Sequence, residues 1–368
     1  MPSLLASLGV AGFDDRFGLN PARGVCLLLV DGLGSHSLRD HPRDAPFLTS
    51  LAYGREPITA GFPATTAASV ATIATGMPVG QHGIVGYTFA IPEGYLLNAL
   101  SWHTHGGGSR VDLRERFVPE DIQPGLTALQ RAASAGVRVT LAVPHAHRDT
   151  GLNRAVLRGA DFRGMHALGD LAAAALAAVS GGQPSLCYAS HGDLDLLGHV
   201  YGVGSLPWRL QLAQIDKLAA VIADGLPPGA ALVVIADHGM VTVTEEGRLD
   251  FDTEPSLQAG VRLLGGDPRA RYVYTEPGAT DDVLAAWCEL IGDRAWIRTR
   301  DEAIAAGWFG PVVEPRIRDR IGDLVVAART DLAVVQSRVT PRLSRLIGHH
   351  GSLTDDEQLV PLLVYEHS

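Results

Sequence analysis

The feature that most constrains the fold is a series of short, continuous apolar runs separated by helix-like segments. The first run spans Gly24 to Val30 (GVCLLLV) and is followed by Asp31 and Gly32. A run without polar alternation predicts a strand buried on both faces, as in a parallel sheet. Strands that alternate with helices predict an α/β layered fold. Further strands are expected at Val137–Val143, Ser185–Ala189 and Ala231–Ala236, and helices at Gly125–Ala135, Leu168–Val179 and Leu210–Ala223.

Acidic and imidazole side chains occur where the predicted strands end. Asp31 follows the first strand, and the segment from Asp193 to His199 follows the third. Asp237 and His238 follow the fourth. Because ligands of parallel sheets bind beyond the carboxyl ends of the strands, we expect a functional site at this edge of the sheet.

Four separated segments supply the oxygen and imidazole ligands that suit borderline divalent metals. Each segment alone has an ordinary explanation as a turn, a helix cap or surface polarity. Together they indicate a metal site, since a carboxylate after a buried strand is costly unless it coordinates something. Aspartate and histidine without cysteine favour an open catalytic site over a closed structural one. The candidate ligands are Asp31, Asp195, His199, Asp237, His238 and His350.

A nucleophile candidate lies in the segment GFPATTAASVATIATG, where small residues after Thr66 favour a helix. Thr66 would then lie near the helix N-terminus, where backbone N–H groups and the helix dipole stabilise an alkoxide and a phosphoryl group. The alternative is that Thr65 and Thr66 cap the helix, and residue physics alone favours capping.

Composition excludes several classes of function. The chain has 30 Lys and Arg against 40 Asp and Glu, a formal charge of -10, which repels nucleic acids and anionic membrane surfaces. No apolar stretch is long enough for a membrane span, and the absence of a basic leader favours a cytoplasmic location. The three cysteines, Cys26, Cys187 and Cys288, are too scattered for a thiolate metal site and are interpreted as small hydrophobic residues.

The sequence changes character at about residue 261. We therefore expect a metal-binding α/β core at 1–260, an inserted α+β cap at 261–339, and a return to the core at 340–368 with the last metal ligand. Arginines of the cap could approach an anionic substrate, although solvated surface charge is the favoured interpretation. These arginines are Arg269, Arg271, Arg298, Arg300, Arg316, Arg318 and Arg320.

With these residues in view, the sequence resembles the alkaline phosphatase superfamily, and most closely its nucleotide pyrophosphatase/phosphodiesterase branch. The resemblance rests on LLLVDGLG, FPATTAASVATIATGMPVGQHGIVGY, DLDLLGHVYG, VIADHGM and HHGSLTDDEQLVPLL, which occur in the order typical of the family. It implies an alkaline-phosphatase-like layered fold with a central, mostly parallel sheet, flanking helices and a small α+β cap.

The resemblance also implies a mechanism and two divalent metal ions, for which zinc is expected. Thr66 would bridge both ions and attack phosphorus to form a phosphothreonine intermediate, which is then hydrolysed. One ion would be bound by Asp195, His199 and His350, and the other by Asp31, Asp237 and His238.

Some positions depart from the family pattern or carry an open alternative. The resemblance implies that an asparagine three positions after the nucleophile binds a phosphoryl oxygen; here that position is Ser69, whose hydroxyl has a shorter reach. His349 is an alternative ligand to His350. A structural role is favoured for His82, and Asp193 is expected to support Asp195 from the same side of a strand.

The segment containing Trp102, His103 and His105 precedes three glycines and could form a mobile loop beside an aromatic leaving group. An ordinary exposed loop is an equally good interpretation of this segment.

The sequence therefore favours metal-dependent hydrolysis of phosphodiester or phosphoanhydride bonds in small molecules such as nucleotides. Phosphomonoester hydrolysis is the nearest alternative, and a phosphonoacetate-hydrolase-like reaction is a third. The alternative from another class is a catalytically silent, metal-stabilised binding module. The expected partner is a small phosphate ester, with no stable nucleic-acid complex and no membrane.

Overall fold

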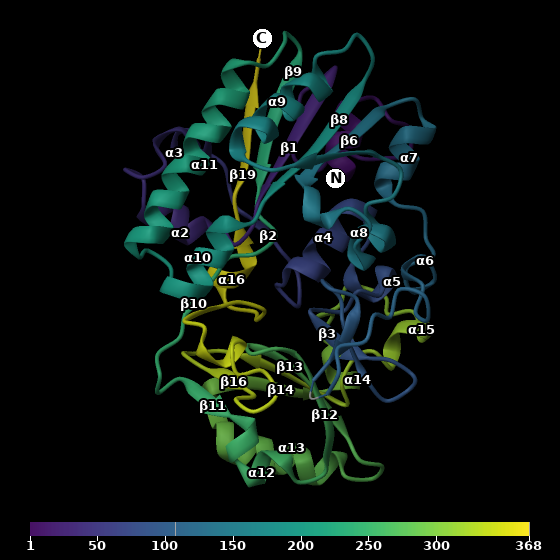
Figure 1. Cartoon of the computed structure of the whole chain (residues 1–368), viewed down its shortest axis with the longest axis vertical. Helices are drawn as coiled ribbons and strands as arrows, with labels where there is room; N and C mark the ends of the chain where they lie inside the picture. Colours follow the sequence, from purple (N-terminus) through teal and green to yellow (C-terminus); the bar gives the residue numbers. More distant parts are fainter. Residues whose placement is uncertain (107, 368) are drawn as a thin grey trace.

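A six-stranded sheet forms the centre of the upper lobe in the computed structural model, which describes residues 1–106 and 108–367 (Figure 1). All neighbouring strands are parallel except β19, which pairs antiparallel with β9. The predicted mostly parallel α/β sheet is confirmed. The strand order is β19 (Leu362–Glu366), β9 (Ala230–Ile235), β1 (Gly24–Val30), β8 (Ser185–His191), β6 (Arg138–Pro144) and β7 (Asp161–Met165).

Strand β1 is apolar throughout because its two faces lie in two different hydrophobic cores. Leu27 and Leu29 pack in the core that includes α4 (Thr66–Thr75). Cys26 and Leu28 point the other way, into a core beneath the long helices. Each fully buried leucine contributes about 1.5–3 kcal/mol, so this strand anchors the sheet against both helical layers.

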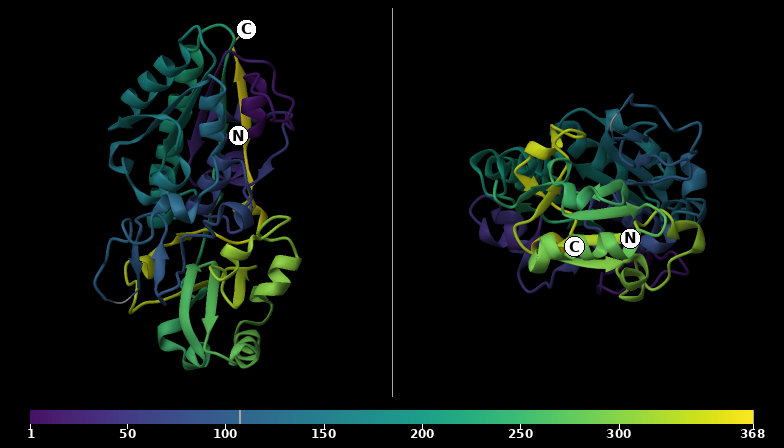
Figure 2. Two further views of the ribbon diagram at one scale, coloured as in Figure 1. Left: turned by 90° about the vertical axis from the view of Figure 1, so that its right-hand side faces the viewer. Right: turned by 90° about the horizontal axis from the view of Figure 1, so that it is seen from below.

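Helices cover both faces of the sheet, as Figure 2 shows from the side. One layer is formed by α9, which has the predicted bounds Leu168–Val179, and by α11 (Leu206–Asp224). The other is formed by α4, α7 (Ala128–Ser134) and α8 (Gly151–Val156). In the described part of the chain, no helix has the length and apolarity required to cross a bilayer.

A second, antiparallel sheet builds the lower lobe, at the end of the molecule opposite the C-terminus. Its strand order is β12-β13-β15-β14, and helix α13 packs on it through Trp287. The short strand β3 (Thr88–Ala90) contacts β12, so the lobe also includes residues from the first third of the chain. The bounds are β12 (Val261–Asp267), β13 (Ala270–Thr275), α13 (Thr280–Ile291), β14 (Ala295–Thr299) and β15 (Leu324–Ala328).

A buried ion pair connects the lower lobe to the C-terminal segment. Arg269, in the turn between β12 and β13, donates Nε–H and Nη2–H to the two oxygens of Glu357, each at 2.8 Å. Both side chains are at most 2% exposed. Arg269 also donates to the backbone oxygens of Thr330 and Leu332. The pair therefore fixes three segments of the chain at one point.

Replacing Arg269 by alanine should destabilise the protein strongly, because Glu357 would be left charged, buried and unpaired. Loss of one partner of such a pair costs about 3–5 kcal/mol, and urea denaturation would measure the change in the free energy of unfolding. Arg39→Ala is the matched control, since its pair with Asp40 is exposed and should contribute little. Equal stability of the two variants would contradict the role of the buried pair.

Candidate metal centre

The predicted ligands and nucleophile converge at the carboxyl edge of the central sheet. Asp31 follows β1 directly, and Asp237 and His238 follow β9. The other residues arrive on neighbouring elements, which end or begin at the same edge. Asp195 and His199 lie on α10 (Asp193–Tyr201), His350 follows β17 (Gly348–His349), and Thr66 is the first residue of α4.

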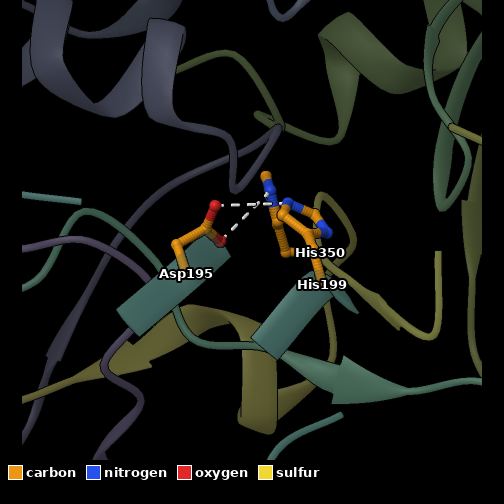
Figure 3. A group of neighbouring side chains, drawn as sticks. All are labelled: Asp195, His199 and His350. Atoms are coloured by element: carbon orange, nitrogen blue, oxygen red, sulfur yellow. Dashed lines mark ion pairs between the residues drawn. The ribbon is translucent and has the colours of Figure 1, made fainter. Parts of the chain in front are cut away.

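Two overlapping groups of side chains offer ligand atoms that lie within 4.8 Å of one another. In the first, shown in Figure 3, the Asp195 carboxylate faces two imidazoles. Its oxygens lie 3.2 Å from Nε2 of His199 and 3.9 Å from Nε2 of His350. The second group contains Asp31, Asp195 and His238, with 3.4 Å between Asp31 Oδ1 and His238 Nε2. Asp195 therefore lies between the two groups.

Asp237 lies next to the second group, beside His238. Its Oδ2 lies 3.6 Å from His238 Nε2, and the side chain is fully buried. Its other oxygen, Oδ1, accepts the backbone N–H of Gly32 at 3.2 Å and that of His238 at 3.1 Å. These contacts hold one oxygen in place and leave the other directed at the cluster.

The three histidines are all oriented in the same way. Each has Nδ1 within 2.7–3.0 Å of a backbone carbonyl oxygen, which can only accept a hydrogen bond. Nδ1 therefore carries a proton, and Nε2 is directed toward the carboxylates. This support is typical of metal-binding histidines. The pairs are His199 with Gly348, His238 with Gly239, and His350 with Ala64.

The cluster contains buried carboxylate oxygens that no hydrogen bond satisfies. Oδ1 of Asp31, Oδ1 of Asp195 and Oδ2 of Asp237 have no partner. Burial raises the pKa of Asp31, and the charges of Asp237 and Asp195 raise it further. Leaving such groups uncompensated is unfavourable, so the donor set fits divalent cations, which would offset both the burial and the mutual repulsion.

The Asp195 and His199 side chains favour each other's charged forms. Burial would raise the pKa of Asp195, but the charge and hydrogen bond of His199 lower it below its ordinary value. Burial would lower the pKa of His199, but Asp195 raises it. Burial and the nearby charge of His238 lower the pKa of His350, which keeps that imidazole neutral and able to bind a metal.

Gly32 allows Asp195 to lie close to the end of strand β1. Its φ is +75°, a conformation that glycine adopts without strain. A Cβ added there would lie 3.0 Å from the Cβ of Asp195. The Asp-Gly pair after β1 therefore allows Asp31, Asp195 and Asp237 to share one small volume.

Thr66 lies beside this cluster, with Oγ1 3.2 Å from His238 Nε2. Thr65 occupies the N-cap position of α4, but its side chain makes no capping hydrogen bond. The preference for helix capping was therefore wrong. Thr66 is the first residue of a ten-residue helix, so the N-terminal N–H groups of α4 lie next to its hydroxyl.

Ser69 does not share the surroundings of Thr66. It lies almost one turn further along α4, is 3% exposed, and lines a cavity of about 200 Å³ together with apolar residues such as Leu27 and with the candidate ligand Asp237. Thr66 does not line that cavity. The contact of Ser69 with a phosphoryl oxygen stays a prediction.

The structure also bears on the expectations for Asp193 and His349. Asp193 and Asp195 lie on helix α10 rather than on a strand, so residues two apart point in different directions and the predicted shared side was wrong. Asp193 instead lies 3.7 Å from His191. His349 Nε2 bonds to the backbone oxygen of Leu346, and His349 is in neither ligand group.

His82 has the structural role that was favoured for it. It is fully buried, its Nε2 bonds to Thr72 Oγ1 at 3.0 Å, and its Nδ1 accepts the backbone N–H of Ile84 at 3.1 Å. Burial, followed by the charges of Arg316 and Arg320, lowers the pKa of His82 to about 3. The imidazole therefore links α4 to the following loop in its neutral form.

The aromatic segment before the three glycines is not a substrate-side loop. Trp102 is fully buried and donates Nε1–H to the backbone oxygen of Phe117 at 2.7 Å. His103 bonds to the backbone oxygen of Ser101, and His105 packs edge-on against Tyr87. Of the three glycines, Gly107 lies outside the described residues.

Several arginines of the lower lobe bond to backbone oxygens or to a carboxylate of the protein. The sequence indicates only substrate contact or solvated surface charge for them. Arg271 is buried and donates to the backbone oxygen of Val334 at 2.6 and 2.8 Å. Arg320 donates to the backbone oxygen of Gly83, and Arg300 pairs with Asp323 at 2.8 Å. None of the arginines named from the sequence lines the cavity beside Thr66.

That cavity, of about 490 Å³, opens directly on the candidate centre, since Thr66, Asp31 and Asp195 form part of its wall. Within the described residues, its lining contains no lysine or arginine. The sequence did not mark most of these positions, because residues such as Val70, Val143 and Tyr188 belong to buried helices and strands, where no local pattern separates a cavity wall from the core. The apolar wall includes Leu29, Val70, Leu100, Val143, Leu152 and Tyr188, and the polar rim includes His147, Asn153, His191 and Asp193.

Solved structures share this fold. The structure is similar to an inactive variant of murine ectonucleotide pyrophosphatase/phosphodiesterase 5 in complex with AMP, with 16% identity, a TM-score of 0.70, and coverage of 94% of this chain and 88% of that one. It is also similar to phosphonoacetate hydrolase from Sinorhizobium meliloti 1021 in complex with phosphonoformate, with 20% identity, a TM-score of 0.68, and coverage of 94% and 90%.

Sequence comparison identifies the family. A search of curated proteins finds no match. Residues 25–353 match the family described as type I phosphodiesterase/nucleotide pyrophosphatase. The resemblance and the enzyme class inferred from the motifs are confirmed. The chain belongs to the type I phosphodiesterase/nucleotide pyrophosphatase family, whose members are metal-dependent phosphoric ester hydrolases.

Proposed function

We propose that this protein hydrolyses phosphodiester or phosphoanhydride bonds in small molecules such as nucleotides, with Thr66 as the nucleophile. The observation that carries the proposal is the position of the Thr66 hydroxyl. It lies beside three unpartnered carboxylate oxygens and three aligned imidazoles, at the wall of a cavity that can hold a leaving group. This arrangement matches the requirements of metal-assisted displacement at phosphorus.

Two divalent ions fit the donor set. Bound there, they would supply Lewis-acid stabilisation of negative charge at phosphorus. Zinc is the proposed metal because the ligands are carboxylates and imidazoles without thiolates. Asp195, His199 and His350 would hold one ion, and Asp31, Asp237 and His238 the other.

In this proposal, Thr66 forms a covalent intermediate. As the bond between Oγ1 and phosphorus forms, the bond between phosphorus and the leaving oxygen breaks, which gives a phosphothreonine that water then hydrolyses. The N-terminal N–H groups of α4 favour negative charge at this position throughout. The cavity wall orients the leaving group, and its apolar surface excludes water from that side.

The lining of the cavity favours an uncharged or aromatic leaving group. A phosphonoacetate-hydrolase-like reaction is a second candidate because a phosphonoacetate hydrolase shares the fold. Its substrate carries a carboxylate as well as a phosphonate, and a site for both would need a cationic side chain. Among the described lining residues only His147 and His191 could provide one. AMP bound to the murine neighbour is consistent with the nucleotide class.

Thr66→Ala should abolish release of nitrophenol from bis(4-nitrophenyl) phosphate, because the attacking oxygen is lost. The expected decrease in kcat is on the order of a thousandfold or more, with metal content unchanged. Thr65→Ala is the matched control and should retain most of the activity, while Thr66→Ser should retain part of it. Wild-type activity in Thr66→Ala would remove this residue from the mechanism, and a preference of the wild type for 4-nitrophenyl phosphate would favour a phosphomonoesterase.

His350→Asn should lower metal content and unfolding temperature together, because metals stabilise the folded state only where their ligands are intact. His349→Asn, one residue earlier, is the control and should keep the wild-type metal content. Plasma mass spectrometry and thermal unfolding, with and without a chelator, would measure both effects. Chelation should destabilise the wild type and the His349 variant more than the His350 variant, and an equal loss of metal in the two variants would contradict the ligand assignment.

A further inference from the structure

Asp267 is a buried carboxylate of the lower lobe that has no hydrogen-bond partner for one of its oxygens. It ends strand β12 and is 8% exposed, and its Oδ2 is unsatisfied. Within residues 1–106 and 108–367, only three other buried carboxylate oxygens share this property, and all three belong to the candidate metal centre. Those oxygens are Oδ1 of Asp31, Oδ1 of Asp195 and Oδ2 of Asp237.

Asp267 faces the same centre from the opposite lobe. A Cβ added to Gly351, the residue after His350, would lie 3.3 Å from the Cβ of Asp267. Burial raises the pKa of its carboxyl group to about 7, and the charges of Arg271, then His238 and His199, act against that rise. The β12-β13 hairpin therefore delivers a carboxylate to the side of the cluster that the central sheet does not reach.

The neighbouring arginine does not neutralise this carboxylate by direct contact. Arg271 donates Nε–H and Nη2–H to the backbone oxygen of Val334, and Nη1 lies 3.5 Å from the backbone oxygen of Gly266. The ion pairs within 4.0 Å found among the described residues include neither Asp267 nor Arg271. Within the described residues, no ion pair therefore compensates the buried Asp267 oxygen, and the charge of Arg271 acts on it only without direct contact.

Asp267 is in neither group of converging ligand atoms, so the geometry does not make it a metal ligand. We infer that Asp267 is a specificity-determining residue, whose negative charge selects monoanionic phosphodiesters over dianionic phosphomonoesters. This inference rests on the proposed function. At pH 8, above the pKa of about 7 of Asp267, its carboxylate is charged and disfavours a monoester with two negative charges more than a diester with one.

The size of the effect follows from Coulomb's law. One extra unit charge several ångströms away, at an effective dielectric constant of about 20, changes relative binding by about tenfold or more. On the cavity side, the described lining supplies no lysine or arginine to hold the second charge. The two features act in the same direction and together favour a diester.

Asp267→Asn removes the charge and keeps the shape of the side chain. The ratio of kcat/KM for bis(4-nitrophenyl) phosphate to that for 4-nitrophenyl phosphate should fall about tenfold, through a gain on the monoester. Asp267→Glu, which keeps the charge, should retain the wild-type ratio. Asp293→Asn removes one charge from the exposed surface of the same lobe and should leave the ratio unchanged.

A binding measurement separates this inference from the proposed function. In the Thr66→Ala background, calorimetry with inorganic phosphate at pH 8 should show about tenfold tighter binding when Asp267→Asn is added. An unchanged ratio and an unchanged Kd, or an equal fall on both esters with loss of metal, would overturn the role of Asp267. A wild type inactive on both esters would instead overturn the proposed function, while the phosphate affinity would still report on Asp267.

Discussion

The rest of the structure depends on the burial of three aspartates at one edge of a parallel sheet. Asp31, Asp195 and Asp237 each keep an oxygen without a hydrogen-bond partner, and their charges repel one another. Such an arrangement is unfavourable unless cations compensate it and a rigid frame holds it together. The frame is the sheet itself, and a hydrophobic core packs against each of its two faces.

The sequence predicted the sheet because buried strands leave local signals, and the residues predicted for the centre lie together at one edge of that sheet. A strand buried on both faces must be apolar throughout, and β1 has the expected bounds of Gly24–Val30. Strand β7, at Asp161–Met165, was missed because it lies at the edge of the sheet, is only partly buried, and has no apolar run. Asp193 was placed on a strand because nothing local showed that a helix begins directly after Gly192.

The residues that were misread depend on contacts between distant segments. The arginines of the lower lobe resemble solvated charge in the sequence, yet Arg269 and Arg271 bond to groups more than 60 residues away. Asp267 stands in a segment, GGDPRA, that is typical of a hairpin turn. Its proximity to the centre follows from the contact of that turn with Gly351, which no local pattern records.

The division of the site between the lobes separates chemistry from selection. Strand ends and helix starts of the core fix the ligands and Thr66, and any shift there would disturb every one of them. The β12-β13 hairpin comes from the other lobe, so it can differ without moving the ligands. The cavity wall, in contrast, is built mainly on β1, α4, β6, β8, α8 and α10, which are core elements that also position Asp31, Thr66 and Asp195. Substrate range can therefore vary on this fold while displacement at phosphorus is kept. The argument for a diester rests on the charge of Asp267 and on a described cavity lining without lysine or arginine, rather than on the metal ligands.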